Sequence, residues 1–285
     1  MTISKTGTIT VILPDGLDMD ENNPIIITVT DHKGRPLDNV TVIVKGDKDK
    51  ESGKTDKDGT LTLPEVTVIE KHGAYIFGYP DGTFGPERSM TRAEAAAIFA
   101  RLLAELKGDT IPETARTRYS DIPADAWYSG YVRYLTACGV IVGTGEDSFS
   151  PDREITRAEV VAMAVRFFEV YDGGNAEIME QYAEFNDVSD GYWAAEYIKD
   201  AAIHGWIRGY GDGSFRASAS ITRAEAVTII NRLLGRVADK DFIDAKARRL
   251  NTFTDMDPKH WAYYDVMESA NAHTADVTEG ESWKR

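Results

Sequence analysis

Short apolar, β-branched runs alternate with turn residues over the first 70 positions of the chain. The runs are Thr8–Leu13, Ile25–Val29, Val40–Val44 and Thr60–Leu63. Turn signals such as Pro14-Asp-Gly16 separate them. Several short strands with this punctuation predict a small antiparallel β-sandwich over residues 1–70.

Beyond residue 70 the apolar positions follow a helical period, and they do so in three copies. A Thr-Arg-Ala-Glu tetrapeptide precedes each copy, at Thr91–Glu94, Thr156–Glu159 and Thr222–Glu225, with intervals of 65 and 66 residues. This pattern is a capping box, so each Thr is expected to cap the N-terminus of a helix, and each Glu side chain to accept a hydrogen bond from the backbone N–H of that Thr. The apolar stripes that we expect in the core are Ala95, Ile98, Phe99, Leu102, Leu103, Val160, Met163, Ala164, Phe167, Phe168, Ala226, Ile229, Ile230, Leu233 and Leu234.

Other residues repeat with the same spacing. Each Thr follows a Phe by seven residues and a Gly by thirteen, and an aromatic-x-Asp triplet stands ahead of a Trp. The first copy has only its back half (72–105), two copies are complete (118–169 and 185–236), and the missing front half stands at 253–273. A circularly closed, pseudo-threefold arrangement uses every half, whereas a linear array leaves both ends with unburied faces.

The arginine of the tetrapeptide is not explained by capping. It takes the first helical position, where the positive end of the helix dipole disfavours a cation by about 0.3–1 kcal/mol. Two readings stay open. The guanidinium and the helix N-terminal amides hold a carboxylate or phosphate, or the arginine makes a structural ion pair within the repeat, for instance to the Asp of the triplet.

The repeated Trp and Gly residues also have two readings each. A half-exposed Trp offers an apolar face for a sugar ring and an N–H donor, whereas a buried Trp clamps two helices. A repeated Gly permits either a tight turn or a close approach of the backbone.

These residues together resemble S-layer homology repeats. The resemblance covers about 72–273, and Gly78-Tyr-Pro-Asp-Gly-Thr-Phe84 followed by Met90-Thr-Arg-Ala-Glu94 shows it well. It implies a three-pronged helical spindle that anchors exported proteins non-catalytically to a secondary cell wall polysaccharide, commonly pyruvylated, on the peptidoglycan of Gram-positive bacteria. The ligand-binding residues that it implies, in grooves between the prongs, are Arg92, Arg157, Arg223, Trp127, Trp193, Trp261, Asp121, Asp187, Asp255, Gly78, Gly143 and Gly209.

The three copies depart from one another. The second, Gly143-Thr-Gly-Glu-Asp-Ser-Phe149, lacks the Asp-Gly turn, and the third lacks a Pro after Phe215. The first is one residue longer ahead of Gly78. We therefore expect fewer than three equivalent sites.

The N-terminal runs resemble the immunoglobulin-like modules of bacterial surface proteins, over about 65 residues from Ile27-Thr-Val-Thr-Asp31 to Leu63-Pro64. Acidic residues at 47–58 do not form an EF-hand, because Gly53 is seventh counted from Asp47 and the motif needs Gly at the sixth place. We predict a solvated hairpin tip there, and no metal site or cofactor in the chain.

Composition narrows the functional classes. The 32 Lys+Arg and 47 Asp+Glu give a net charge of −15, which argues against a nucleic-acid partner. No apolar run approaches the roughly 18 residues of a membrane helix, so no membrane insertion is predicted. The single Cys138 forbids an internal disulfide and is expected to be buried at a helix end. The five His form no HExxH and no Gly-x-Ser-x-Gly occurs, so no enzyme is predicted.

The predicted fold is α+β and multidomain, with the β-sandwich at 1–70 and a mainly helical spindle at 71–285. The predicted function is a non-catalytic cell-surface anchor. The alternative is an S-layer-type structural protein whose main role is lateral self-association. Because no export signal is visible at Met1–Lys5, we expect the C-terminal fragment of a larger exported protein that acts at the cell wall.

Overall fold

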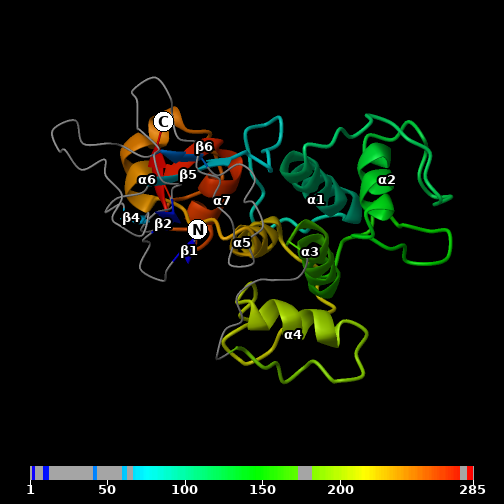
Figure 1. The fold of residues 1–285 in the computed structure, drawn as a ribbon. Coiled ribbons are helices and arrows are strands. Elements are labelled where there is room, and N and C mark those ends of the chain that lie inside the picture. Colours follow the sequence, from blue (N-terminus) through cyan, green and yellow to red (C-terminus); the bar gives the residue numbers. More distant parts are fainter. Residues whose placement is uncertain are drawn as a thin grey trace. The chain divides into compact units, whose positions relative to one another are not determined.

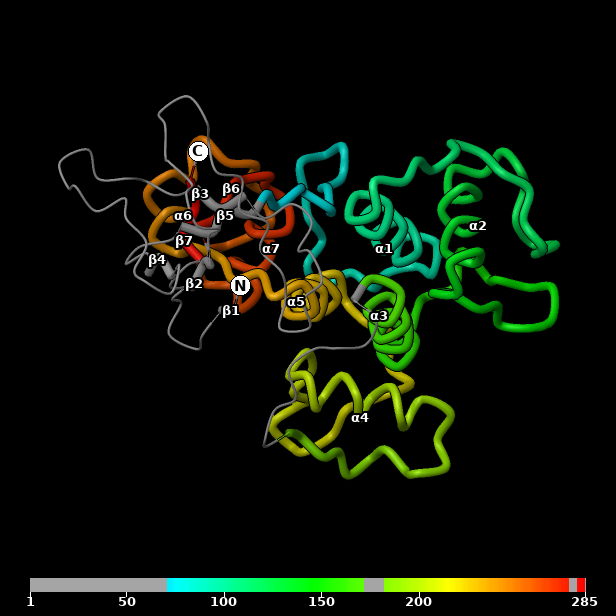
Figure 2. Tube along the Cα trace, in the orientation of Figure 1, coloured from blue at the N-terminus to red at the C-terminus, as the bar shows by residue number. Residues whose placement is uncertain are grey.

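The structure is a computed structural model of the 285-residue chain. It describes residues 67–172, 182–276 and 281–284, together with the backbone of four short N-terminal strands. The chain forms two compact units (Figures 1 and 2). Unit 1 consists of Met1–Ala74, Ala238–Lys246 and Asn271–Arg285, and unit 2 consists of Tyr75–Val237 and Ala247–Ala270.

Unit 1 contains two antiparallel sheets. One has the strand order β1-β2-β4, formed by Thr2–Ile3, Ile9–Ile12 and Thr60–Thr62. The other has the order β3-β5-β6-β7, formed by Thr41–Ile43, Thr67–His72, His273–Asp276 and Ser282–Lys284. The pairing of β5 with β6 places His72 opposite His273. The short helix α6 (Lys240–Lys246) completes the described part of this unit.

Only part of the N-terminal prediction falls on described residues. Strands β2, β3 and β4 lie within three of the four predicted runs, and Ile25–Val29 lies outside the described residues. The side chains of residues 1–70 are outside them as well. The β-sandwich, the immunoglobulin-like module and the acidic stretch therefore remain predictions, as does the division into 1–70 and 71–285.

Unit 2 is built from three pairs of packed helices (Figure 1). The pairs are α1 (Arg92–Lys107) with α2 (Ser129–Ala137), α3 (Arg157–Asp172) with α4 (Ala195–Ile203), and α5 (Arg223–Leu233) with α7 (Tyr263–Ala270). Helix α3 also packs against α1 and α5. A short 3-10 helix, η1, spans Ala247–Arg249. In the described part of the chain, no helix is both long and apolar enough to cross a membrane.

The capping boxes are confirmed in all three copies. Thr91 accepts a hydrogen bond from the backbone N–H of Glu94, and the Glu94 carboxylate accepts one from the N–H of Thr91. The same reciprocal pair occurs at Thr156 and at Thr222. The stripes behind these caps are buried, as predicted, with two exceptions: Phe168 and Leu234 are partly exposed.

The segments ahead of α1, α3 and α5 join one another in a closed ring of backbone hydrogen bonds. Met90 N–H donates to the carbonyl of Ile221 at 3.1 Å, Ile221 donates to Ile155 at 3.1 Å, and Ile155 donates back to Met90 at 2.9 Å. Because each link connects two copies, the ring ties the N-termini of α1, α3 and α5 together. The three-pronged spindle itself stays a prediction.

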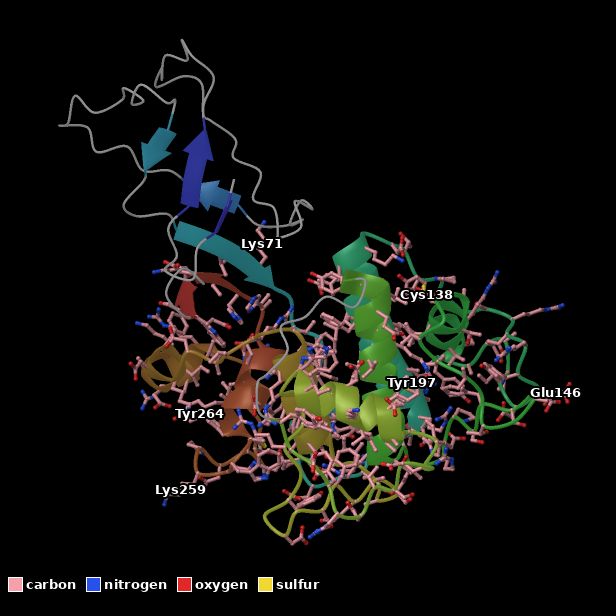
Figure 3. All side chains as sticks on the ribbon, turned by 60° about the horizontal axis from the view of Figure 1, so that its bottom comes forward. Lys71, Cys138, Glu146, Tyr197, Lys259 and Tyr264 are labelled. Atoms are coloured by element: carbon pink, nitrogen blue, oxygen red, sulfur yellow. The ribbon has the colours of Figure 1, made fainter. Side chains whose placement is uncertain are left out.

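Cys138 ends α2 as its C-cap residue and is partly exposed, not buried as expected (Figure 3). Its backbone N–H donates to the carbonyls of Thr136 and Tyr134.

Candidate ligand-binding grooves

The N-termini of the three repeated helices have no amides left for an anion. In α1, the N–H groups of Arg92 and Ala93 donate to the carbonyls of Arg153 and Pro151, both at 3.0 Å. The next two N–H groups, of Glu94 and Ala95, bond to Thr91. Corresponding bonds close the start of α3 and α5. The hypothesis that these amides hold a carboxylate is therefore wrong, because neighbouring copies already occupy the donors.

The motif arginines are buried and bonded across the copies. Each Nε donates to the carbonyl of a repeated Phe, at 2.8–2.9 Å. Arg92 also lies 3.1 Å from Glu159, and Arg157 lies 2.9 Å from Glu225, both measured between Nη1 and Oε1. For Arg92 and Arg157 the ion-pair reading was right in kind and wrong in partner, because the acceptor is the capping-box Glu of the next copy. The Arg223 guanidinium donates to the carbonyls of Phe84 and Phe77.

The repeated aspartates hold a backbone turn. The carboxylate of Asp255 accepts from the N–H groups of Phe84 and Gly85, at 2.7 and 2.8 Å. Asp121 and Asp187 make the same pair of bonds to the corresponding residues of the other copies. Burial raises the pKa of Asp187, but the two N–H donors outweigh it and the pKa lies below its usual value. We therefore assign these carboxylates to the scaffold.

The repeated glycines allow an aromatic ring to lie against the backbone. A Cβ on Gly78 would stand 2.5 Å from the Phe253 ring, and one on Gly209 would stand 2.5 Å from the Phe185 ring. At Gly143 the nearest ring is that of Tyr119, at 2.7 Å. In each copy the aromatic residue of the aromatic-x-Asp triplet needs this space. Close approach is therefore the reading that holds for all three glycines.

The three repeated tryptophans are exposed. Trp127, Trp193 and Trp261 expose 57%, 55% and 59% of their surface. The reading of a core Trp that clamps two helices is therefore wrong for all three. An exposed indole of this kind presents a flat apolar face and an N–H donor to a ligand.

Two of these tryptophans line grooves. Groove A has a volume of about 220 Å³ and is lined by Arg92, Val142, Gly143, Glu159, Ala162, Met163, Arg166 and Trp193. Groove B has a volume of about 310 Å³ and is lined by Glu87, Arg157, Ile207, Arg208, Gly209, Tyr210, Thr222, Glu225, Thr228, Ile229, Arg232 and Trp261. Each groove combines the motif Arg of one copy, the Gly and Glu of the next, and the Trp that follows.

The structure thus brings together half of the residues that the sequence analysis nominated. Arg92, Gly143 and Trp193 meet in groove A. Arg157, Gly209 and Trp261 meet in groove B. The nominated residues that line neither groove are Arg223, Trp127, Gly78, Asp121, Asp187 and Asp255.

A second row of repeated arginines escaped the sequence analysis. Arg101, Arg166 and Arg232 each follow the capping-box Glu by seven residues. Arg166 lines groove A, where its guanidinium donates to the hydroxyl of Tyr197 at 2.9 and 3.1 Å. Arg232 lines groove B. The shared spacing was visible in the sequence, but these residues lie outside the tetrapeptide that drew attention.

Groove B collects an additional cation. Arg208, an exposed residue, lines the groove together with Arg232, and within the described residues no carboxylate pairs with it. Burial and the nearby charge of Arg208 lower the pKa of Arg232, while Asp265 acts in the opposite direction. A bound anion would offset this repulsion, because it places a negative charge between two guanidinium groups.

Tyr210 adds a polar wall to the same groove. Its hydroxyl donates to Glu225 Oε1 at 2.6 Å, and burial, followed by this hydrogen bond, raises the pKa of the hydroxyl. The Arg157 guanidinium lies 4.8 Å from the Tyr210 ring centre. Glu225 and Arg157 are thus held by each other and by Tyr210, which leaves Arg208 and Arg232 as the cations that a ligand can engage.

Three segments of the chain match the S-layer homology domain, at residues 56–96, 118–161 and 184–227. The chain therefore carries three repeats of this domain. Each match ends within the first turns of α1, α3 or α5. The arginines Arg101, Arg166 and Arg232 lie just beyond these ends.

The chain is also similar to cell-surface proteins of bacteria. It is 36% identical over 211 residues to Cell surface glycoprotein 1 of Acetivibrio thermocellus, covering 72% of this chain and 9% of that protein. It is 33% identical over 226 residues to the Cellulosome-anchoring protein of the same organism, covering 79% and 48%. With the Surface-layer 125 kDa protein of Lysinibacillus sphaericus it shares 29% identity over 200 residues, covering 67% and 15%.

This chain spans less than half the length of each of these three relatives. Their names and the domain matches support a role in cell-wall anchoring and point to a non-catalytic module. Proteins named as enzymes also occur among the matches, and this chain again covers only part of their length.

Proposed function

We propose that this chain anchors a protein to the bacterial cell wall by binding an anionic secondary wall polysaccharide that carries ketal-linked pyruvate. The three S-layer homology matches and the similarity to a protein named for anchoring support the anchoring role. The site of action is then the cell surface, on peptidoglycan. The anchor performs no chemistry, and any reaction belongs to other parts of the protein that it holds.

The observation that carries the proposal is the composition of groove B. Arg208 and Arg232 line it beside the exposed face of Trp261. A pyruvate ketal carries one carboxylate, which suits a guanidinium in charge-assisted and bidentate hydrogen bonds. The sugar that bears the ketal then packs on the indole face. Groove A offers the same combination with a single such arginine, Arg166, and Trp193.

The motif arginines take a different part in this scheme. Arg92 and Arg157 are held by carbonyls and by a Glu, and they shape the floor of each groove. The second row of arginines makes the contact with the polymer. This division assigns the ligand to arginines that form no ion pair with a carboxylate among the described residues, since Arg166 bonds to a hydroxyl and Arg232 to a carbonyl.

The acidic surface does not oppose such binding. The net charge is −15, but at physiological salt the Debye length is only about 8 Å, so distant carboxylates are screened from a local pair of arginines. Two grooves on one chain that engage one polymer also raise the overall affinity, because the second contact is intramolecular.

Titration calorimetry with purified pyruvylated wall polymer, and with the same polymer after removal of the ketal, tests the proposal. We expect binding that disappears with the ketal. Arg232→Gln should weaken binding about 10–100-fold, the equivalent of losing one hydrogen bond to a charged group. Arg248→Gln is the matched control, since it removes the same charge from an exposed position in η1 and should leave binding unchanged.

Binding that survives removal of the ketal would show that the carboxylate is not the recognised group. Absence of binding to both polymers, in a folded protein, would favour the alternative role of lateral self-assembly in a surface lattice. Sedimentation velocity over a range of protein concentrations then measures that assembly directly.

A further inference from the structure

Three side chains of unit 1 converge on one point of the sheet β3-β5-β6-β7. His72 ends β5, His273 begins β6 opposite it, and Glu281 stands directly ahead of β7. His72 Nδ1 lies 3.1 Å from His273 Nε2, and each of these nitrogens lies 3.3 Å from Glu281 Oε1. Three donor atoms thus form a nearly equilateral triangle.

The position of the protons makes this triangle unusual. His273 Nδ1 lies 2.8 Å from the carbonyl oxygen of Asn271, which can only accept, so Nδ1 carries the hydrogen. In the neutral ring, Nε2 then directs its lone pair into the triangle. The carboxylate oxygen of Glu281 does the same. With both rings neutral, His72 Nδ1 offers a third electron pair to the triangle when the hydrogen of that ring lies on Nε2.

The cluster is also shielded from water. The side chains of His72 and His273 are each 5% exposed, and that of Glu281 is 3% exposed. A carboxylate removed from water needs a positive partner, because an unpaired buried charge is costly. A divalent cation at the centre of the triangle would face this carboxylate directly and supply such a partner.

The spacing fits a tetrahedral cation. A zinc ion binds imidazole nitrogen and carboxylate oxygen at about 2.0–2.2 Å, so two of its ligands are separated by about 3.3–3.6 Å in a tetrahedron. The three separations here are 3.1, 3.3 and 3.3 Å. Calcium and magnesium prefer six or more oxygen ligands and do not suit two imidazoles.

Trp283 supplies the outer support that such a site needs. Its indole ring stacks on His273 with 3.7 Å between ring centres, and its Nε1–H donates to Glu281 Oε1 at 3.2 Å. Its own backbone N–H donates to Asp239 Oδ2 at 2.9 Å. One residue therefore orients two of the three side chains, as outer-shell partners do at metal sites.

We propose that His72, His273 and Glu281 bind a divalent zinc-type ion. The ion links β5 to β6 and β7, which the chain separates by about 200 residues, and so fastens the C-terminal strands to the sheet. Its role is structural. The ligands belong to no short motif, which is why the sequence analysis predicts no metal site.

The test uses the full chain without a histidine tag, dialysed against a chelator and then titrated with Zn²⁺ alone. We expect one equivalent of bound zinc and a rise in melting temperature. His273→Gln should lower the affinity more than 100-fold, and Trp283→Phe, which keeps the stacked ring but loses the N–H donor, should lower it about 10–100-fold. His260→Gln is the matched control, because it removes a His from another His–Glu pair, with Glu87 at 3.0 Å.

Visible spectroscopy with Co²⁺ decides the question without any variant. The strong bands of tetrahedral Co²⁺ in the folded wild-type chain support the site. Their absence, a wild-type chain that binds no zinc, or binding that His273→Gln and Trp283→Phe leave intact would each overturn it and identify the cluster as a proton-sharing triad. The spectrum and Trp283→Phe remain informative if His273→Gln does not fold.

Discussion

The Glu225 carboxylate joins Arg157 and Thr222, which belong to different repeats. One carboxylate oxygen lies 2.9 Å from the Arg157 guanidinium, and the other accepts from the backbone N–H of Thr222 at 3.1 Å. The bond from Arg157 comes from the second copy, whereas the bond from Thr222 lies within the third copy. A residue that caps its own helix therefore also fixes the neighbouring copy against it.

We expect Glu225→Ala to lower the free energy of unfolding by about 3–5 kcal/mol, because it leaves the nearly buried Arg157 without its carboxylate and breaks the capping box. Urea denaturation followed by circular dichroism measures the change. Glu196→Ala, an exposed acidic residue in the first turn of α4, should stay within about 0.5 kcal/mol of the wild type. A loss at Glu225 as small as that of this control would contradict the double role.

The close approach at Gly209 predicts a second effect on stability. Gly209→Ala puts a Cβ 2.5 Å from Phe185 and 2.7 Å from the carbonyl of Ser214, at a φ of +66°. We expect a loss of about 2–4 kcal/mol from overpacking and backbone strain together. Gly211→Ala is the control two residues away, since nothing lies within 4 Å of its Cβ. Equal thermal stability of the two variants would contradict the packing argument.

Backbone strain at Ser150 predicts a gain in stability. Ser150 has a φ of +58°, and the corresponding residue of the first copy is Gly85, with a φ of +69°. Ser150→Gly should raise the free energy of unfolding by about 0.5–1 kcal/mol, because glycine adopts the left-handed region without a Cβ clash. Ser148→Gly, at a position without positive φ, should bring no gain. Differential scanning calorimetry of both variants distinguishes the cases.

Glu159 makes the stability of unit 2 sensitive to acid. Burial raises the pKa of its carboxyl, but hydrogen bonds from Arg153 and Thr156 and the charge of Arg92 outweigh burial, so the pKa lies below the ordinary 4.5. A carboxyl whose pKa is lower in the folded state than in the unfolded state contributes its full stabilisation above the unfolded-state pKa. This stabilisation is lost as the pH falls through the folded-state pKa. We expect stability to decline between about pH 5 and pH 3.

Chemical denaturation across this pH range checks the prediction. Glu159→Gln should destabilise the protein at pH 7 and flatten the decline below pH 5. Glu146→Gln, at an exposed loop residue, should keep the wild-type pH profile (Figure 3). A wild-type slope in Glu159→Gln would show that other carboxyls cause the acid sensitivity.

The sequence predicted what depends on neighbours along the chain. The capping boxes at Thr91, Thr156 and Thr222 each lie within four residues, so their spacing alone was sufficient. The apolar stripes behind them needed only the helical period. Recurrence at fixed intervals also selected Trp193 and Trp261, which do line the grooves.

Contacts between copies were not predictable in the same way. Arg92 bonds to Glu159, 67 residues away, and nothing in the repeat identifies which carboxylate of the next copy it meets. The exposure of the tryptophans depends on what packs around them, so the pattern left both readings open. His273, at the end of the last half-repeat, pairs in a sheet with His72, 201 residues earlier, and no spacing within the repeats indicates that contact.

The hydrogen-bond ring of Met90, Ile155 and Ile221 has a consequence for how such proteins evolve. In an open array, duplication or deletion of one unit leaves the remaining junctions intact. Here each of the three segments donates to one neighbour and accepts from the other, so the loss of one repeat leaves an orphaned donor and an orphaned acceptor together. Gain of a repeat would require all the existing junctions to change angle. Unequal recombination among the copies is therefore expected to yield proteins that do not fold, and the number of repeats is expected to stay at three.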